Sequence, residues 1–233
     1  MTYVMSDIHG EYRKYLKMLE KINFSDDDTL YILGDMIDRG PQSAELLIDI
    51  FSRQNVIAIM GNHELMAIPM LEMLLSDISE KEFQNSINYT AIFSLLNWKM
   101  NGGSSTCNSF SKISPSERLR LLSEIKKLPL YKTVEVNGNK FILVHSGISN
   151  FDENKSLECY TAEELVFSRP DFNKRYYSEN HTYVVYGHTP TDTVIGENKI
   201  FKGSGNICID CGATFENGKL ACLALETMAE FYV

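Results

Sequence analysis

Histidine and carboxylate residues recur directly after short apolar runs of this chain. Four of the five histidines follow such a run, close to a glycine or a carboxamide, and two aspartates occupy the same kind of position. In chain order the clusters are Asp7-Ile8-His9, Gly34-Asp35, Gly61-Asn62-His63, His145 and Gly187-His188. Short apolar runs predict strands, and the loops of an α/β sheet meet beyond the carboxyl ends of its strands. The five clusters can therefore converge at one place.

These residue types together predict a metal site. Imidazole and carboxylate ligands suit zinc, iron and manganese. Two carboxylates, three histidines and a carboxamide exceed what one tetrahedral metal needs, whereas two metal ions that share a bridging carboxylate would use them all. Such a pair, roughly 3.5–4 Å apart, clamps the attacking and leaving oxygens of an in-line displacement. The competing interpretation is five unrelated turns, since Gly-Asp and Gly-Asn are common turn pairs. Five clusters in register after successive strands favour the metal site.

The elements that must position these clusters form a layered pattern. The first expected strands are Thr2–Met5, Thr29–Leu33 and Asn55–Met60. Helical spacing between them predicts parallel strand pairing in an α/β fold. Around residues 65–128 the strand pattern gives way to expected helices at Leu65–Leu75, Glu82–Trp98 and Ser116–Leu128. Strands are expected again at Tyr131–Val136, Lys140–Val144, Tyr183–Tyr186, Ile207–Asp210 and Leu220–Glu226. We interpret residues 1–233 as a single domain with a helical insertion near the mouth of the site.

The charge balance argues against two classes of partner. The 233 residues include 22 lysines and arginines against 31 aspartates and glutamates, a net charge of −9. Nucleic-acid binders need basic surfaces to displace counterions, and anionic membranes attract basic segments, so neither partner is expected. No apolar run is long enough for a transmembrane helix and no secretory leader is recognisable, which predicts a cytoplasmic protein. We expect a monomer.

The cysteines do not indicate a further site. Their odd number, scattered through a long chain, argues against a disulfide framework. Cys208 and Cys211 form a C-x-x-C pair, but no second Cys/His pair at zinc-ligand spacing accompanies it. Ile207-Cys208-Ile209 has the pattern of a buried strand, so a structural role is favoured over a redox one.

The clusters belong to longer motifs. These are Asp7-x-His9-Gly10, Gly34-Asp35-x-x-Asp38-Arg39-Gly40, Gly61-Asn62-His63-Glu64, His145-Ser146-Gly147 and Gly187-His188-Thr189. Over residues 3 to about 226 the chain resembles the calcineurin-like metallophosphoesterases, and more narrowly the bacterial and phage members of the phosphoprotein phosphatase branch. The resemblance implies a sandwich of two mixed β-sheets flanked by helices. It also implies two divalent or transition metal ions, with manganese favoured and iron or zinc as alternatives. The implied ligands are Asp7, His9 and the bridging Asp35 for the first metal, and Asp35, Asn62, His145 and His188 for the second.

The resemblance assigns a different role to His63, which follows a ligand in the sequence. The matching histidine of the family is the general acid, and Asp38 matches the carboxylate that orients it and stabilises its charged form. Arg39 matches a phosphate-binding arginine, whose planar guanidinium fits two phosphate oxygens as lysine cannot. Outside this motif, Asp38-Arg39 would be interpreted as a surface ion pair.

Two further segments resemble the substrate side of bacterial members. Phe167-Ser168-Arg169-Pro170 resembles a Trp-x-Arg-Pro segment that supplies another phosphate contact, with phenylalanine in place of the usual tryptophan. The alternative for Arg169 is a helix-terminal arginine that satisfies the last carbonyls. Asn101-Gly102-Gly103 resembles a substrate-side loop, and a plain helix stop explains it almost as well.

The function implied is a dinuclear metal-dependent phosphomonoesterase, with phosphoserine and phosphothreonine in phosphoproteins or phosphopeptides as substrates. A metal-bridged hydroxide would attack phosphorus directly. The rival is a symmetrical dinucleoside tetraphosphate hydrolase, which shares the five motifs. That group typically has alanine before the arginine and ends the third motif in Asp, where this chain has Asp38 and Glu64. A rival from another class, a non-catalytic metal-stabilised binding module, would not need His63 and Asp38.

Overall fold

The strands form two five-stranded sheets in the computed structural model, which describes residues 1–75 and 89–233. The first sheet has the order β10-β9-β1-β2-β3 and the second has the order β4-β5-β6-β8-β7. The first sheet contains β1 Thr2–Met5, β2 Thr29–Ile32, β3 Val56–Ala58, β9 Ala221–Ala224 and β10 Glu230–Tyr232. The second contains β4 Tyr131–Val136, β5 Asn139–Val144, β6 Thr182–Tyr186, β7 Phe201–Lys202 and β8 Asn206–Cys208. The expected sandwich of two mixed sheets is confirmed.

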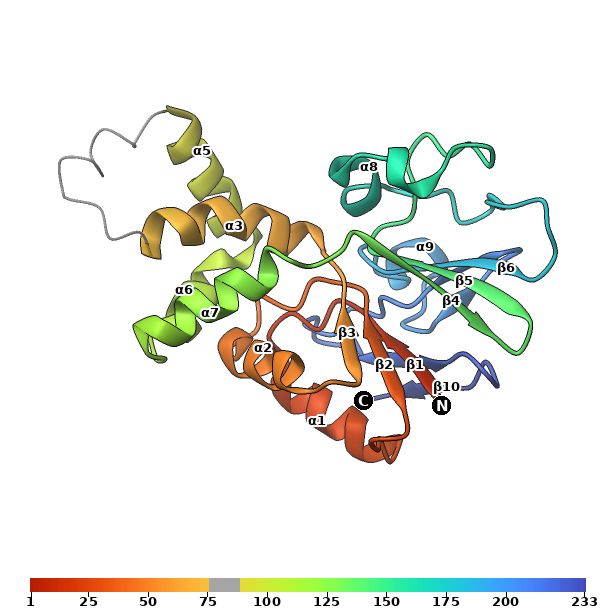
Figure 1. Cartoon of the computed structure of the whole chain (residues 1–233), viewed down its shortest axis with the longest axis horizontal. Coiled ribbons are helices and arrows are strands. Elements are labelled where there is room, and N and C mark those ends of the chain that lie inside the picture. Colours follow the sequence, from red (N-terminus) through yellow and green to blue (C-terminus); the bar gives the residue numbers. More distant parts are fainter. Residues whose placement is uncertain (76–88) are drawn as a thin grey trace.

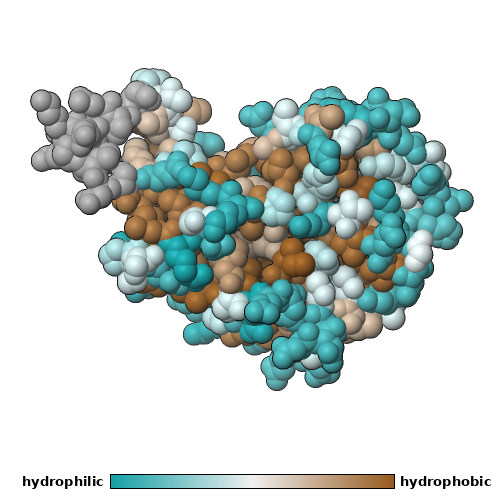
Figure 2. Space-filling view, viewed as in Figure 1, coloured by the Kyte–Doolittle hydropathy of each residue, from teal (hydrophilic) through white to brown (hydrophobic). Residues whose placement is uncertain are grey.

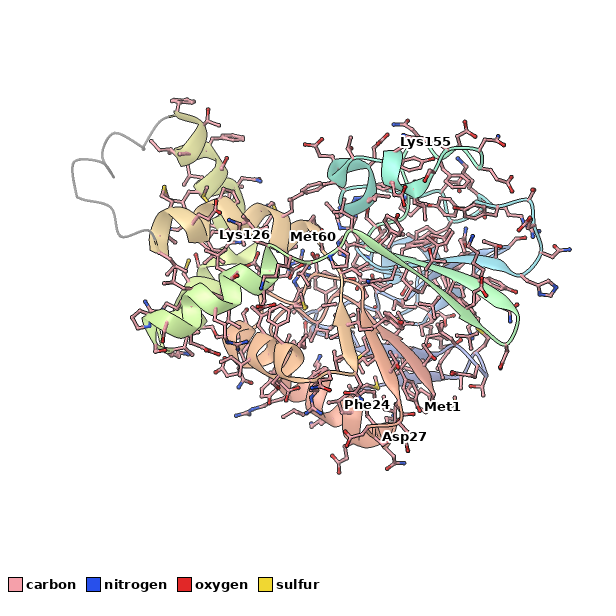
Figure 3. All side chains as sticks on the ribbon, viewed as in Figure 1. Met1, Phe24, Asp27, Met60, Lys126 and Lys155 are labelled. Atoms are coloured by element: carbon pink, nitrogen blue, oxygen red, sulfur yellow. The ribbon has the colours of Figure 1, made fainter. Side chains whose placement is uncertain are left out.

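Each sheet contains three parallel strands, and their carboxyl ends point toward the same region. β1, β2 and β3 are parallel neighbours that reach one edge of the first sheet, with antiparallel β9 and β10 on the other side. β5, β6 and β8 are parallel neighbours in the middle of the second sheet, with antiparallel β4 and β7 at its two edges. Figure 3 labels Met1 and Asp27 at the amino-terminal end of the first sheet and Met60, just after β3, at its opposite end. The polar clusters therefore follow the strands into one region, as the sequence predicts.

Alternating side chains divide the interior into three layers. Met5 joins the buried residues of α1 and α2, whereas its neighbour Val4 packs between the two sheets. In β5, Leu143 also faces the space between the sheets, and Val144 faces an outer layer that contains Leu165 of α8. This period of two is expected for strands that are buried on both faces.

Two helices, α1 Tyr12–Lys21 and α2 Ser43–Ser52, cover the first sheet (Figure 1). The insertion contains α3 Asn62–Leu75, α5 Tyr89–Trp98, the π-helical turn η1 Lys99–Gly103, α6 Ser104–Phe110 and α7 Pro115–Ile125. Three short helices accompany the second sheet: η2 Leu157–Cys159, α8 Ala162–Val166 and α9 Asp192–Ile195. α3 packs against α5 and α7, and α2 packs against α6 and α7, so the insertion is fastened to the first sheet through α2.

Most predicted elements match the structure, and the differences have local causes. Two helix starts have side-chain caps: Ser114 accepts a hydrogen bond from the Glu117 N–H, and Thr161 forms a complete capping box with Glu164. Of the expected helix Glu82–Trp98, residues 82–88 lie outside the described residues, and α5 accounts for the rest. The prediction missed β7 and β10, which are only two and three residues long, and α6, which η1 separates from α5.

Among the described residues, none of the helices has both the length and the apolar character required to span a lipid bilayer. All five cysteines are free, and Cys208 lies buried in β8 as its sequence context predicts.

Candidate active site

Main-chain hydrogen bonds join the motif loops beyond the ends of the strands. After β1 and β2, the Asp7 N–H donates to the Gly34 carbonyl (3.2 Å) and the His9 N–H donates to the Asp35 carbonyl (2.8 Å). In the second sheet, the Gly187 N–H donates to the His145 carbonyl (2.7 Å). Gly187 has to be small, because a Cβ there would overlap the Asp7 carboxylate. Backbone pairing thus joins the loops within each sheet, and the close contact of Gly187 with the Asp7 carboxylate brings the loops of both sheets to one site.

The backbone of these loops is unusual. Six non-glycine residues at the site have left-handed φ angles: Asp7 (51°), His9 (47°), Asp35 (51°), Asp38 (69°), Arg39 (65°) and His188 (65°). Such conformations cost of order 1–3 kcal/mol each and persist where surrounding contacts enforce them, which happens most at functional sites. Their concentration here marks the strand ends as the site independently of side-chain chemistry.

His9 presents an unpartnered nitrogen to the site. Its Nδ1 donates to the Ile37 carbonyl (2.8 Å), which leaves Nε2 without a proton. Nε2 is buried, has no hydrogen-bond partner and lies 3.6 Å from Asp35 Oδ2. Burial, followed by the nearby charges of His63 and Arg39, lowers the pKa of His9 well below its usual value, so the ring is neutral. A buried bare imidazole nitrogen beside a carboxylate is what a metal ligand requires.

A second group of ligand atoms gathers on the other side of Asp35. His145 Nδ1 donates to the Leu33 carbonyl (2.7 Å), and its Nε2 lies 2.8 Å from Asn62 Oδ1, 3.3 Å from His188 Nδ1 and 3.4 Å from Asp35 Oδ1. His188 Nδ1 also lies 2.8 Å from Asn62 Oδ1. Burial, followed by the charge of His145, lowers the pKa of His188 to about 2. Asp35 therefore has one oxygen directed toward each group, as a bridging carboxylate would.

The charges of the site fit bound cations. Asp7 and Asp35 are 3% and 1% exposed, and buried carboxylates are paired or bind metals. Burial, together with the neighbouring Asp7 and Glu64, raises the pKa of Asp35 well above its usual value. Asp7 Oδ2 is oriented by the Ser6 hydroxyl and by the His188 N–H (2.9 Å). Together with the unpartnered His9 nitrogen, these carboxylate oxygens fit two metal ions. All six predicted ligands lie in the site.

The predicted proton donor lies on the side of the site that faces the insertion. His63 Nδ1 is 2.7 Å from Asp38 Oδ2, and its Nε2 lies 3.1 Å from Arg39 NH2 and 3.8 Å from Asp35 Oδ2. Burial alone would lower the pKa of His63, but the Asp35 charge and the Asp38 hydrogen bond outweigh it and raise the pKa. The ring is thus oriented by Asp38 and directs Nε2 toward Asp35 and Arg39, and because a guanidinium can only donate, Nε2 accepts from Arg39 when it carries no proton.

Position alone does not separate His63 from the metal ligands. The ligand atoms of His9, Asp35 and His63 all lie within 4.8 Å of one another, as do those of Asp35, His145 and His188. What distinguishes His63 is its partner on Nδ1. His9 and His145 donate to backbone carbonyls, whereas His63 pairs with the carboxylate of Asp38. A carboxylate partner favours a charged imidazolium, which a proton donor needs and a metal ligand does not.

Arg169 reaches the site from the second sheet's side. Its NH1 donates to Thr189 Oγ1 (3.2 Å), beside the His188 loop, and its side chain is otherwise exposed. Arg39 is also exposed. Both predicted phosphate-binding arginines therefore flank the ligand groups with donors still free to face solvent.

Two buried carboxylates complete the site, and sequence reasoning assigned neither of them this role. Glu64 accepts backbone N–H groups from Gly61, Asp35, Met36 and Ile37, so it supports the loop beneath the ligands. Asp210, two residues after the end of β8, accepts the Gly212 N–H (2.8 Å). Its burial, followed by repulsion from Asp7, raises the pKa of Asp210. A polar residue after a strand and before a glycine was the available signal, but the prediction assigned Asp210 to the strand itself.

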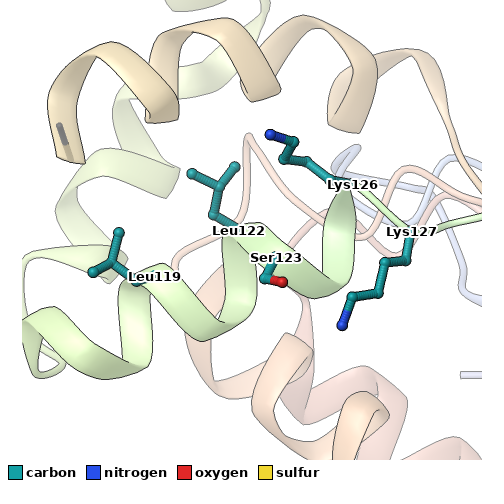
Figure 4. Close-up of a pocket in the computed structure, with 5 residues that line it drawn as sticks. All are labelled: Leu119, Leu122, Ser123, Lys126 and Lys127. Carbon is teal, nitrogen blue, oxygen red and sulfur yellow. The ribbon is translucent and has the colours of Figure 1, made fainter.

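The site lies where the insertion meets the rest of the chain. In Figure 1, α5 and α8 lie on opposite sides of the strand ends, and in Figure 2 the surface is notched between these two parts. A separate hollow of about 370 Å³ lies along α7 (Figure 4). Its lining residues are Leu119, Leu122, Ser123, Lys126 and Lys127. Since none of these is a predicted site residue, and Lys126 pairs with Glu72 (2.5 Å), that hollow belongs to the outer face of the insertion.

Comparison with known proteins identifies the family. Residues 2–208 match the family model described as calcineurin-like phosphoesterase. The chain belongs to this family. The resemblance drawn from the motifs is thereby confirmed, and the chain is a phosphoesterase-superfamily hydrolase.

Curated proteins similar to this chain include two that carry different names. The symmetrical bis(5′-nucleosyl)-tetraphosphatase of Buchnera aphidicola (strain Tuc7) is 32% identical over 120 residues, 51% of this chain and 42% of the relative. The Haemophilus ducreyi protein of the same name is 27% identical over 174 residues, 54% of its length. The chain thus spans about half of these relatives. Serine/threonine-protein phosphatase 2 of Salmonella typhimurium is 27% identical over 215 residues, 88% of both chains.

Solved structures agree on the fold. A candidate diadenosine tetraphosphatase has a TM-score of 0.68 at 16% identity and covers all of this chain and 92% of its own. A protein serine/threonine phosphatase from Saccharomyces cerevisiae has a TM-score of 0.57 at 13% identity and covers 95% of this chain and 71% of its own. At these identities the likeness concerns the fold alone.

Proposed function

We propose that this chain is a dinuclear metal-dependent phosphomonoesterase that hydrolyses phosphoserine and phosphothreonine in proteins. The observation that carries the proposal is the buried pair of His63 and Asp38, 2.7 Å apart, with Arg39 beside it. A serine or threonine alkoxide is a strong base and leaves slowly unless it is protonated, so its departure benefits most from an oriented acid.

Each part of the site has a role in this reaction. When bound, two metal ions supply a nucleophile near neutral pH and withdraw charge from the phosphoryl oxygens. Asp7, His9, Asp35, Asn62, His145 and His188 would hold them. Arg39 and Arg169 bind phosphoryl oxygens as charge redistributes during transfer. His63 Nε2 gives its proton to the departing oxygen, which leaves as a serine or threonine hydroxyl, while Asp38 stabilises the imidazolium beforehand. Manganese is the proposed metal.

The curated relatives support a second candidate, symmetrical hydrolysis of dinucleoside tetraphosphates. That reaction expels a nucleoside diphosphate, a weak base that departs with less need of a proton. Of the two residues that differ from the tetraphosphatase pattern, Asp38 contacts His63, whereas Glu64 only supports the loop. The argument for the phosphoprotein substrate therefore depends on Asp38. The Salmonella phosphatase, which matches this chain over 88% of both sequences, agrees with it.

A three-substrate assay tests the proposal. Metal-stripped protein, reloaded with manganese, would be offered an aryl phosphate, a phosphothreonine peptide and diadenosine tetraphosphate. We expect kcat/KM for the peptide to exceed that for the dinucleotide. If the dinucleotide is cleaved faster by orders of magnitude, the chain is a tetraphosphatase and the proposal is wrong.

An Asp38→Ala variant sharpens the choice, because alanine is typical of the tetraphosphatase group at this position. The variant leaves His63 without its carboxylate partner. It should lose peptide hydrolysis to a greater degree than dinucleotide hydrolysis, since only the alkoxide depends strongly on protonation. Equal losses on both substrates would remove the support that Asp38 gives to the phosphoprotein assignment.

A further inference from the structure

The Asp38 carboxylate is held by two side chains from the insertion. Trp98, the last residue of α5, donates its indole Nε1–H to Asp38 Oδ2 (2.8 Å), the same oxygen that pairs with His63. Thr106 of α6 donates its hydroxyl to Asp38 Oδ1 (2.5 Å) and accepts the Asp38 N–H (2.9 Å). Trp98, Thr106 and Asp38 are fully buried. Each carboxylate oxygen therefore has a partner from the insertion.

This arrangement limits how the carboxylate can turn. Asp38 stands on a left-handed backbone (φ 69°), which alone does not fix the plane of its carboxylate. With Oδ1 engaged by Thr106 and one side of Oδ2 engaged by Trp98, the remaining acceptor direction of Oδ2 points at His63 Nδ1. The orientation of the imidazole, and thus of Nε2, follows from that direction.

The Asn101-Gly102-Gly103 segment explains how the insertion reaches this position. The Gly102 carbonyl accepts the Arg39 N–H (3.2 Å), and Gly102 has a φ of 104°. A Cβ on Gly102 would lie 2.7 Å from the Arg39 nitrogen, and a Cβ on Gly103 would overlap the Trp98 ring. The two glycines therefore allow close contact of the insertion with Asp38-Arg39, which neither a plain helix stop nor a substrate loop requires.

We propose that Trp98 and Thr106 are positioning residues for proton donation, which fix Asp38 so that His63 Nε2 faces the leaving group. Neither residue needs to touch substrate or metal. The insertion then determines the efficiency of the acid, whereas the strand-end loops determine metal binding. This inference rests on the proposed phosphomonoesterase function.

Substitutions that remove the hydrogen-bonding group of each residue test the proposal. Trp98→Phe and Thr106→Val should each lower kcat about tenfold on a phosphothreonine peptide, a fraction of the roughly 10²–10⁴-fold that general-acid catalysis supplies. On an aryl phosphate, whose phenolate leaves without much help, both variants should stay close to wild type. Thr106→Ser, which restores the hydroxyl, should recover the peptide rate. Both metals should remain bound by elemental analysis.

A matched control separates positioning from packing. Ile125→Val removes a methyl group from α7 in the same buried cluster as Trp98, without touching Asp38. It should lower thermal stability and leave the ratio of peptide to aryl rates unchanged. Equal losses on both substrates in Thr106→Val, or no recovery in Thr106→Ser, would overturn the proposal.

The hydrogen bond between Trp98 and Asp38 can also be observed directly, without an activity assay. Trp98 is the one tryptophan of the chain, so a ¹⁵N spectrum of the full chain loaded with diamagnetic zinc has one indole N–H signal. We expect that signal to be shifted downfield and protected from solvent exchange, and to lose both properties in Asp38→Ala. An unchanged signal would overturn the contact itself. If wild type hydrolyses no phosphomonoester, the proposed function fails; if only the Trp98 and Thr106 variants behave unexpectedly, the positioning inference fails alone.

Discussion

The half of the site that is predicted to bind metal and the half that is predicted to donate a proton are held in different ways. His9 and His145 are oriented by the carbonyls of Ile37 and Leu33, which belong to loops that follow the strands. His63 is oriented by the side chain of Asp38, which is itself held by side chains from the insertion. The orientation of His9 and His145 thus depends on the path of the backbone, and that of His63 depends on the identity of distant side chains.

This difference predicts that the halves can be damaged separately. A backbone carbonyl cannot be removed by mutation, so no single side-chain change removes the partner that orients His9 or His145. The acid half contains a chain of side-chain contacts, any of which can be removed while the ligands stay in place. Asp35 is the exception, because it lies within 4 Å of His9, His63 and His145.

The largest effect is therefore expected from Asp35→Asn. Both oxygens of the Asp35 carboxylate face imidazole nitrogens. Asparagine replaces one of these oxygens with an N–H₂ group, so both metal sites should weaken. Loss of a supporting residue alone typically costs about 10–100-fold in metal affinity or activity, and loss of the bridge should exceed that. Elemental analysis should find fewer than two ions per chain. Retention of two ions at wild-type affinity would contradict the bridging role.

His63→Asn should break only the acid half. We expect both metals to remain bound, with kcat on a phosphothreonine peptide falling by roughly 10²–10⁴-fold and kcat on an aryl phosphate falling far less. The matched control is His181→Asn, because His181 is an exposed histidine that pairs with Asn139 far from the motifs. It should change neither rate. Loss of a metal from His63→Asn would make His63 a ligand, as its distance to His9 and Asp35 allows.

The two halves also differ in how far the sequence could predict them. The clusters that contain the predicted ligands could be recognised because each follows a predicted strand, a pattern visible within ten residues of the chain, while the assignment of these residues to two metals came from the family resemblance and stays a prediction. The contacts of Asp38 with Trp98 and Thr106 cross 60 and 68 positions, and no local pattern indicates them. The roles given to the acid residues came from family resemblance rather than from spacing, and they stay predictions.

The contacts of Glu64 also join residues that are far apart in the sequence, and no local pattern indicates them. The sequence comparison treated it as a possible indicator of substrate, because it ends the third motif. The structure places its side chain under the second motif loop, with backbone N–H groups from 27 to 29 positions away. Its identity therefore concerns the support of the ligands.

Glu64→Gln should accordingly lower stability. Both Glu64 oxygens accept backbone N–H groups, and the amide N–H₂ of glutamine would face donors instead. An unsatisfied buried donor costs about 1–3 kcal/mol. Burial raises the pKa of Glu64, so removal of its charge offsets part of the loss, and we expect a net decrease near the lower end, about 1 kcal/mol. Chemical denaturation of the metal-free chain would measure it.

The control for this variant is Glu72→Gln, since Glu72 is a half-exposed partner of Lys126 on the surface of the insertion. Exposed pairs of this kind contribute about 0–1 kcal/mol, so its unfolding midpoint should hardly move. A Glu64→Gln protein as stable as Glu72→Gln would mean that the loop does not need the carboxylate.

The smallest effect is expected from the two arginines, and it should differ between the halves. Arg39 is tied to the insertion through its N–H and lies beside His63, whereas Arg169 contacts Thr189 next to a ligand loop. Lysine keeps the charge but cannot bind two oxygens of one phosphoryl group. We expect Arg39→Lys to lower kcat and raise KM, and Arg169→Lys to raise KM alone, each by about 2–10-fold, because only the second donor of the fork is lost.

The control is Arg120→Lys, because Arg120 lies on α7 and pairs with Glu117; this variant should change neither kcat nor KM. Steady-state rates on the phosphothreonine peptide decide the comparison: an Arg169→Lys variant with unchanged KM would limit Arg169 to holding Thr189, and phosphate recognition would then rest on the insertion side of the site.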